Sequence, residues 1–318
     1  MPDDSEPNGC SVSRTLDVIG DAWGFLVLRS AFFGARRFED YASEVASSRI
    51  ILSKRLNRLV AHDVLKRQLY SNRPQRFEYR LTERGREMYP IFVAMMLWGD
   101  RWAAWPDGPP LVLTHKSCGS RIGAKTVCSA CGEEVHPQTV RHDVLDPLAL
   151  RAGPAEVRVR RSNSPENFLY GRECSVARTL MLFGDRWSFL ILRDAFLGKR
   201  RYDQFQTDLG IASNILADRL QSLCEASILE RRPYQTGPDR FEYRLTEQGL
   251  ALYPSLLTMV AWGDKWIFGG KPSPISLTHT VCGCRFTPSL NCESCGQPIS
   301  AHDVEYEYAR PQSAPPAR

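Results

Sequence analysis

The chain has 318 residues, and at about 150 residues per domain this length predicts two domains. Hydrophobic residues make up 43%, which excludes a disordered chain, and the net charge of +5 permits a nucleic-acid partner without requiring one. We expect no membrane span, since no apolar run approaches about 18 residues, and no secretory signal, since the N-terminus is acidic. In the cytoplasm, where we therefore place the chain, ten cysteines indicate metal or redox chemistry before disulfides.

The sequence contains an internal repeat. CSVSRTL at Cys10–Leu16 returns as CSVARTL at Cys174–Leu180, and RFEYRLTE at Arg76–Glu83 returns unchanged at Arg240–Glu247. Both pairs are separated by 164 positions. A constant offset means that no insertion separates the two copies, which we interpret as duplicated whole domains.

The first copy begins with predicted helices. Apolar spacing over Ser13–Ala31 predicts one helix, or two helices with a bend at Gly20. Phe38–Val45 is a short second helix. Ser47 or Ser48 can cap a third helix, whose leucines form a buried stripe.

A hairpin and a last helix follow. Val64–Tyr70 and Arg76–Thr82 alternate apolar and polar residues, and the turn residues of Ser71–Gln75 join them into a β-hairpin. Glu83–Ala104 has the spacing of one long helix. Helix, short helix, helix, hairpin, helix is the order of a winged helix-turn-helix, in which the hairpin is the wing.

Both copies carry the pattern C-S-V-x-R-T-L, G-D-x-W, L-x-L-R-x-A-F, F-E-Y-R-L-T-E-x-G and W-G-D-x-W. This pattern resembles the HxlR-type winged helix regulators of bacteria. Gly210–Leu220 of the second copy is typical of that family's recognition helix, whereas Ala46–Ile50 of the first copy departs from it. The resemblance implies a transcription factor, expected to be a repressor, that binds double-stranded operator DNA, usually as a homodimer.

A recognition helix reads base edges through solvent-facing side chains near its N-terminus. Arg49 suits guanine, Asn214 suits adenine and Lys54 suits a phosphate. Asp218, at the position that matches Lys54, does not suit a phosphate but could accept a hydrogen bond from cytosine N4. Because the outer face differs between the copies, we expect them to prefer an asymmetric or imperfect repeat. The candidates are Ser47, Ser48, Arg49, Ser53 and Lys54 in copy one, and Ala212, Ser213, Asn214, Ala217 and Asp218 in copy two.

Arginines add further candidate contacts with DNA. Arg73, Arg76 and Arg240 flank the hairpin turns and suit the minor groove, while a solvated charged face is the competing interpretation. Weaker candidates precede the second helix of each copy, where phosphate contact is expected: Arg36, Arg37, Arg200 and Arg201.

A Cys/His unit follows each long helix. Two close ligand pairs, with glycines after several cysteines, have zinc-ribbon spacing and predict one closed, structural zinc site per copy. Reduced, packed thiols are the competing interpretation, and Cys284 offers a competing ligand in copy two. The predicted ligands are His115, Cys118, Cys128 and Cys131 in copy one, and His279, Cys282, Cys292 and Cys295 in copy two.

Cys10 and Cys174 precede the first helix of each copy. Some HxlR-type regulators resemble this chain there and use the cysteine as a thiol sensor, and a thiolate at a helix N-terminus is physically favoured. A small buried apolar residue is the alternative. Cys224 lies in an apolar stretch and is expected in the core.

The predicted fold is α+β and mainly α, with tandem winged helix-turn-helix domains that each precede a small zinc-ribbon-like β module. The function predicted is sequence-specific DNA binding; the alternative is a redox- or ligand-responsive protein-interaction module. No catalytic motif is present, so no enzyme is expected. For the oligomeric state there are two alternatives: one chain mimics a dimer with its two copies, or two chains pair as a homodimer. The expected parts are winged helices at 10–106 and 174–270, ribbons at 111–136 and 275–302, a linker at 137–168 and a disordered tail at 309–318.

Overall fold

The first predicted helix is two helices. α1 covers Ser11–Ile19 and α2 covers Ala22–Phe32 in the computed structural model, which describes residues 9–103, 105–151, 173–235 and 240–309. Gly20 between them has φ +97, a left-handed conformation that glycine adopts without steric cost. Asp21 then caps α2, because its carboxylate accepts a hydrogen bond from the Gly24 amide at 3.1 Å.

The helix-turn-helix pair forms as predicted. α3 covers Phe38–Glu44 and α4 covers Arg49–Ala61. Ser48 is the cap of α4, since its Oγ accepts from the Ile51 amide at 3.3 Å. The stripe of Leu52, Leu56 and Leu59 is fully buried, which leaves the opposite face of α4 for other contacts.

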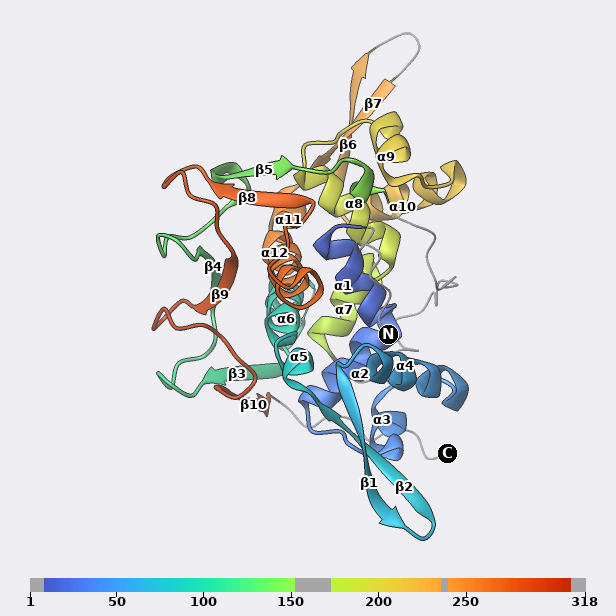
Figure 1. The fold of residues 1–318 in the computed structure, drawn as a ribbon. Helices are drawn as coiled ribbons and strands as arrows, with labels where there is room; N and C mark the ends of the chain where they lie inside the picture. The colour runs from blue at the N-terminus through green and yellow to red at the C-terminus, as the bar shows by residue number, and fades with distance from the viewer. Residues whose placement is uncertain (1–8, 104, 152–172, 236–239, 310–318) are drawn as a thin grey trace. The chain divides into compact units, whose positions relative to one another are not determined.

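The wing is a β-hairpin, as predicted, but the last helix is broken. β1 (Leu65–Asn72) pairs antiparallel with β2 (Gln75–Leu81), and the hairpin projects beyond the helices of its unit (Figure 1). The predicted single helix is wrong: α5 covers Glu83–Arg86 and α6 covers Tyr89–Trp102. Pro90 lies in the first turn of α6, where its missing N–H costs nothing, so it favours a new helix start.

The second copy repeats these elements. It ends with a π-helical turn over Asp264–Phe268. Its helices and wing are α7 (Ser175–Phe183), α8 (Arg186–Phe196), α9 (Tyr202–Leu209), α10 (Ser213–Glu225), β6 (Leu229–Gln235), β7 (Arg240–Leu245), α11 (Glu247–Leu250) and α12 (Tyr253–Gly263). The short strands that follow the winged helices are β3 (Leu111–His115), β4 (Ala124–Cys128), β5 (Val140–Val144), β8 (Ile275–His279), β9 (Pro288–Cys292) and β10 (Val304–Tyr308).

The compact units of the structure do not follow the two sequence copies. Each unit takes its winged helix from one copy and further segments from the other. The predicted domain boundaries therefore describe the duplicated sequence, but not the folded units. Unit 1 comprises Met1–Asp17, Thr126–Arg158 and Arg186–Ser289, and unit 2 comprises Val18–Lys125, Val159–Asp185 and Leu290–Arg318.

The N-terminal helices are among the exchanged segments. In unit 1, Ser11 Oγ of α1 donates to the Asp264 carboxylate, and Thr15 Oγ1 donates to the Met259 carbonyl at 3.1 Å. Gly263 lies against the Ser11 backbone, so even a Cβ there would clash. In unit 2 the corresponding bonds run from α7 to α6: Ser175 to Asp100, and Thr179 to Met95 at 2.9 Å.

The last strand of each copy is exchanged as well. β5 pairs antiparallel with β8 in unit 1, and β10 pairs antiparallel with β3 in unit 2. Residues 137–150 of the predicted linker therefore form structure: two short 3₁₀ turns, Pro137–Thr139 and Leu148–Leu150, flank β5. The linker prediction fails here because β5 completes a sheet with residues far away in sequence.

The rest of the predicted linker, from residue 152, and the predicted disorder over 310–318 fall outside the described residues. The fold class is confirmed as α+β and mainly helical. Within the described part of the chain, none of the helices has the length and apolar character that crossing a bilayer requires.

Candidate nucleic-acid interface and metal centres

The N-terminal end of α4 is open to solvent. Ser48, Arg49 and Lys54 are exposed, while Ser47 and Ser53 are partly exposed. All of these lie away from the buried leucine stripe, and four of the five are available to a partner. The exception is Ser47, whose hydroxyl oxygen is buried. Arg55 points the other way: its Nε donates to Asp21 Oδ1 at 2.7 Å, which ties α4 to the start of α2. Arg55 therefore has a structural role rather than belonging to the reading face.

Arg49 has a partner in this structure. Its guanidinium donates to both carboxylate oxygens of Glu39, at 2.7 and 3.2 Å, and lies over the Phe38 ring at 4.7 Å. The hydrogen bonds to Glu39 raise the pKa of Arg49 above its ordinary value. Both side chains are more than half exposed, and such pairs are worth little in water. Arg49 can therefore exchange Glu39 for a guanine at small cost.

The recognition helix of copy two has a different surface. Ala212, Ser213, Asn214 and Asp218 are all exposed at the N-terminal half of α10. Ala212 occupies the cap position and makes no side-chain cap bond, unlike Ser48. Asp218 forms an ion pair with Arg219 beside it. The two recognition helices thus share a fold and present different chemistry.

An arginine pair precedes the second helix of each copy. Hydrogen bonds hold the backbone of each pair in place, and the side chains are exposed. Arg36 and Arg37 donate their amides to Asp40 Oδ2 at 3.0 and 2.8 Å, and the Arg37 guanidinium lies over the Tyr70 ring of the wing at 4.7 Å. In copy two, Gln204 accepts from the Arg200 and Arg201 amides in the same way. The four side chains are exposed.

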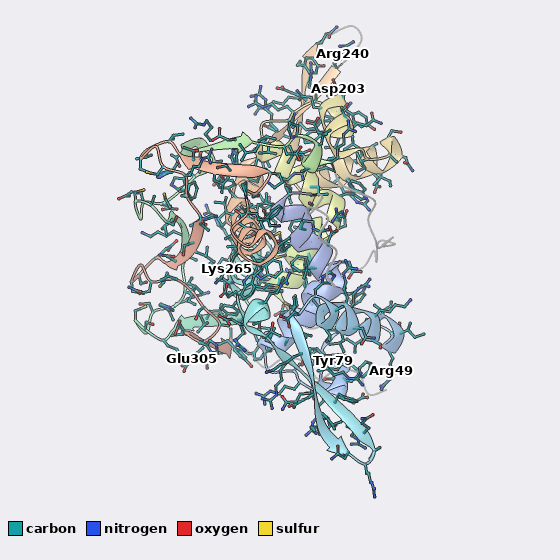
Figure 2. The ribbon with its side chains drawn as sticks, viewed as in Figure 1. Arg49, Tyr79, Asp203, Arg240, Lys265 and Glu305 are labelled. Carbon is teal, nitrogen blue, oxygen red and sulfur yellow. The ribbon has the colours of Figure 1, made fainter. Side chains whose placement is uncertain are left out.

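The wing arginines are exposed at the ends of the hairpins. Arg73 and Arg76 lie at the turn between β1 and β2, and Arg240 begins β7, where Figure 2 shows it on the projecting hairpin. Residues 236–239, which complete that turn, lie outside the described residues.

Sequence reasoning missed several exposed groups in this region. Ile50 is 70% exposed in the first turn of α4, at the position that Asn214 occupies in copy two. It stands outside the leucine stripe, and that signal could have identified it. Sequence reasoning also missed the basic residues on the first strand of each wing, although the alternating pattern of these strands was visible. The exposed basic residues there are Lys66, Arg67, Arg231 and Arg232.

The Cys/His residues gather into two clusters, each within one unit. The first, in unit 2, joins His115 and Cys118 to Cys292 and Cys295. The second, in unit 1, joins Cys128 and Cys131 to His279 and Cys282. The predicted residues are the same, but the predicted grouping by copy is corrected. Each cluster takes one ligand pair from each copy, because the strands that carry the pairs are assembled across the copies.

The distances within the clusters suit a tetrahedral ion. In unit 2, His115 Nδ1 lies 3.3 Å from Cys295 Sγ and 3.6 Å from Cys118 Sγ, and Cys118 Sγ lies 4.0 Å from Cys292 Sγ. A tetrahedral zinc with four such ligands has edges of about 3.5–3.8 Å, given Zn–S near 2.3 Å and Zn–N near 2.0 Å. In unit 1 the corresponding distances are 3.3 Å for Cys131 to His279, 3.7 Å for Cys282 to His279 and 4.0 Å for Cys128 to Cys282.

The surroundings favour thiolates at one cysteine of each cluster. A backbone hydrogen bond from Ser120 and a bond with His115 lower the pKa of Cys118 to about 6. A backbone hydrogen bond at Cys284 leads the causes that lower the pKa of Cys282 to about 7, against the opposing effect of burial. Cys284 itself is exposed, and its Sγ donates to the Cys282 carbonyl at 3.6 Å. Two clusters that could hold a metal ion are therefore present.

A match to a protein-family model shows the family of this chain. The model described as HxlR-like helix-turn-helix matches residues 18–106 and again 182–270, together more than half of the chain. The chain belongs to the HxlR-like helix-turn-helix family. The tandem arrangement inferred from the repeat is confirmed by the two separate matches.

Similar proteins are named as regulators. An HTH-type transcriptional regulator of Mycobacterium tuberculosis, Rv3095, is 43% identical over 132 residues, which cover 42% of this chain and 84% of the relative. The regulator YdeP of Bacillus subtilis is 34% identical over 95 residues, covering 30% and 74%. Among solved structures, PA1607 is 40% identical with a TM-score of 0.37, covering 41% of this chain and 91% of that one. This HxlR-like chain is a DNA-binding transcriptional regulator.

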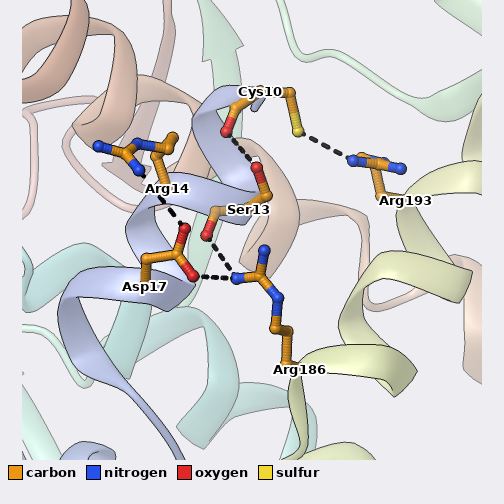
Figure 3. Close-up of polar contacts among 6 residues, drawn as sticks. All are labelled: Cys10, Ser13, Arg14, Asp17, Arg186 and Arg193. Atoms are coloured by element: carbon orange, nitrogen blue, oxygen red, sulfur yellow. Dashed lines mark hydrogen bonds and ion pairs between the residues drawn. The ribbon is translucent and has the colours of Figure 1, made fainter. Parts of the chain in front are cut away.

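The two N-terminal cysteines of this HxlR-like chain have different surroundings. Cys10 is fully buried, and its Sγ accepts a hydrogen bond from Arg193 Nη1 at 3.1 Å (Figure 3). Asp17 and the Ser13 carbonyl hold Arg186 nearby. Cys174 is partly exposed and caps α7 without a side-chain bond. A redox role for either thiol stays a prediction.

Proposed function

We propose that this chain is a sequence-specific repressor that places α4 and α10 in the major groove of operator DNA and its wings in the minor groove. The observation that carries the proposal is the pair of solvent-open recognition-helix N-termini, each beside exposed arginines of the wing and of the preceding turn. Helix N-termini and arginines at such positions contact bases and phosphates. Since its partner is DNA, we place its action in the cytoplasm, at the nucleoid.

The two recognition helices support readout of two different half-sites. Arg49 suits the O6 and N7 atoms of guanine, and the exposed Ile50 suits a thymine methyl. Ser213 and Asn214 stand at the equivalent positions of α10, where Asn214 suits adenine. We propose as further contacts Ser47, Ser48, Ser53, Lys54, Ala212 and Asp218 on the helices, Arg73, Arg76 and Arg240 on the wings, and Arg36, Arg37, Arg200 and Arg201 at phosphates.

DNA from the chain's own promoter region tests this function. We expect the observed binding constant to fall linearly with salt on a logarithmic scale, by about 0.9 per phosphate contact. Arg76→Ala and Arg240→Ala each remove one wing cation and are expected to make the slope shallower. A flat salt response would favour the alternative function, a protein-interaction module without DNA binding.

Glu39 competes with DNA for Arg49 under this proposal. We expect Glu39→Gln to tighten operator binding severalfold, because it frees the guanidinium and removes a negative charge near phosphates. Asp203→Asn is the comparison variant, since Asp203 stands at the equivalent position of copy two, where residue 213 is serine and the carboxylate pairs with Arg201 at 3.6 Å instead (Figure 2). Fluorescence anisotropy with labelled operator measures both variants, and an equal gain for both would reduce the Glu39 effect to general charge.

We further propose that each Cys/His cluster holds one structural zinc ion. Four ligand atoms lie within 4.8 Å of one another in each cluster, and the sulfur and nitrogen distances suit a tetrahedron. Four protein ligands close the site, so no position is left for a substrate. The ions would fasten segments of the two copies to each other within each unit.

One chain is proposed to supply both winged helices of the regulator. Each unit takes an N-terminal helix and a last strand from the opposite copy, so a single chain already completes both units. Light scattering is expected to give the 36.0 kDa mass of one chain. A mass twice as large would assign the chain to a homodimer instead.

A further inference from the structure

Unit 2 contains an apolar pocket beside its helix-turn-helix. Phe32, Phe33, Tyr89 and Phe92 form its aromatic wall, and Val176 of the exchanged helix α7 closes one side. The pocket is open to solvent on one side, and apart from Arg29 and the Tyr89 hydroxyl its lining side chains are apolar. The aromatic rings also pack on one another, with Phe32 5.1 Å from Tyr89 and 5.2 Å from Phe92.

One charged side chain, Arg29 of α2, belongs to this wall. Arg29 is only 6% exposed, and its Nη2 donates to Glu44 Oε2 at 3.2 Å. Its Nε and Nη1 are buried and find no hydrogen-bond partner among the described residues. Native proteins seldom leave such donors unsatisfied, because burial has removed their water, so these two nitrogens require an explanation.

Unit 1 offers a direct comparison, because Arg193 is the same arginine in the other copy. There Nη2 donates to the Leu150 carbonyl at 2.8 Å, Nε donates to Asp194 Oδ1 at 2.8 Å, and Nη1 donates to Cys10 Sγ at 3.1 Å. Figure 3 shows the contact with Cys10. Leu150 is itself buried. The three donor nitrogens of the equivalent arginine are thus all satisfied, by a carbonyl, a carboxylate and a thiol.

The partners in unit 2 differ. Cys174, the repeat equivalent of Cys10, is present but partly exposed, and Arg29 Nη1 has no hydrogen-bond partner among the described residues. Asp194 is replaced by Ser30, whose Oγ donates to the Leu26 carbonyl instead. The repeat equivalent of Leu150 is Ala314, which belongs to a polar, proline-rich stretch and lies outside the described residues. The sequence therefore supplies no second leucine at the position that satisfies Arg193.

We propose that the pocket of unit 2 binds a small aromatic carboxylic acid. The carboxylate oxygens take Nε and Nη1 of Arg29, the two nitrogens that Asp194 and Cys10 satisfy at Arg193, and the ring packs among the four aromatic side chains. The arrangement combines an apolar wall with one buried donor group, which is the usual composition of a small-molecule site. A ring offset-stacked or edge-on against phenylalanine adds to the burial of apolar area.

The pocket is connected to the DNA-reading helices through one ion pair. Glu44, the partner of Arg29, is the last residue of α3, just before the cap of α4. An acid at Arg29 competes with Glu44 and so acts on the end of α3. We therefore expect ligand binding to change operator affinity severalfold, an expectation that rests on the proposed function.

Benzoate is the probe, titrated calorimetrically into the full-length chain without DNA. We expect one saturable site per chain, because Arg193, the equivalent arginine of unit 1, already has an acceptor for each of its three nitrogens. We expect no binding of benzylamine, which has a cation in place of the acceptor. Arg29→Met is expected to weaken benzoate binding at least tenfold. Val176→Phe fills the pocket with Arg29 intact and is expected to have the same effect, whereas Arg101→Met removes an exposed charge of the same unit as the matched control.

Thermal unfolding of each variant shows that it is folded. Absence of saturable benzoate binding, or unchanged affinity in both Arg29→Met and Val176→Phe, would overturn the proposal. Binding that appears only after removal of residues 310–318 would assign the pocket to the chain's own tail and would also overturn it. Since the titration contains no DNA, a failure of the pocket is distinguishable from a failure of DNA binding.

Discussion

Replacing Cys118 and Cys292 together by serine is expected to lower the zinc content from two ions per chain to one. The two residues belong to different sequence copies, yet their sulfur atoms lie 4.0 Å apart in the same cluster. Losing both therefore destroys only that site. Replacing Cys118 and Cys128 instead, which belong to the same copy but to different clusters, is expected to leave no tightly bound zinc.

Elemental analysis of the purified full-length variants measures these contents. The two double variants remove the same number of thiols and serve as controls for each other. The reverse pattern, with one ion left after the Cys118 and Cys128 change, would mean that each copy closes its own site. A wild-type chain without zinc would refute the metal proposal as a whole, and it would leave the DNA-binding function untouched.

Asp21→Ala is expected to destabilise unit 2 by about 3–5 kcal/mol, the usual effect of removing one partner from a buried ion pair. Asp21 is 3% exposed, accepts from Arg55 at 2.7 Å and also caps α2. Its removal leaves the mostly buried Arg55 guanidinium without a counter-charge and the Gly24 amide without its acceptor. Urea unfolding followed by tryptophan fluorescence measures the loss.

Asp40→Ala is the matched control, because Asp40 also accepts backbone hydrogen bonds at a helix start, but in solvent. We expect it to cost about 1 kcal/mol, as the loss of an exposed cap does. Similar losses for both variants would show that capping alone explains the role of Asp21 and that the ion pair with Arg55 contributes little.

The elements of each copy were predictable because their signals are local. Ser48 caps α4 by accepting a hydrogen bond from the amide of Ile51, only three residues along the chain. The β1–β2 hairpin follows from the alternation of apolar and polar residues at neighbouring positions. The break before α6 was missed, although Pro90 signalled it. β5 was missed for another reason: Val140–Val144 is a strand only because it pairs with Ile275–His279, more than a hundred residues away.

The candidate DNA contacts were found from the sequence, with the exception of Ile50 and the strand cations. Their partners were not. Nothing in the sequence of copy one indicates that Arg49 is bound by Glu39, or that Arg29 keeps two unsatisfied nitrogens. These facts depend on the rotamers and distances that packing sets.

The sequence by itself determined that this protein is a duplicated winged helix-turn-helix with two sets of Cys/His residues that could hold a metal ion. Periodicity, capping residues and ligand spacing are properties of short stretches, and they are present in each copy. Only the tertiary structure decided which copy's helix, strand and ligand pair complete which unit. The two copies have the same ligand types at the same spacing, so grouping within or across copies gives chemically identical sites. The choice depends on long-range packing and strand pairing, which bring residues 174 and 154 positions apart into contact and have no local signature.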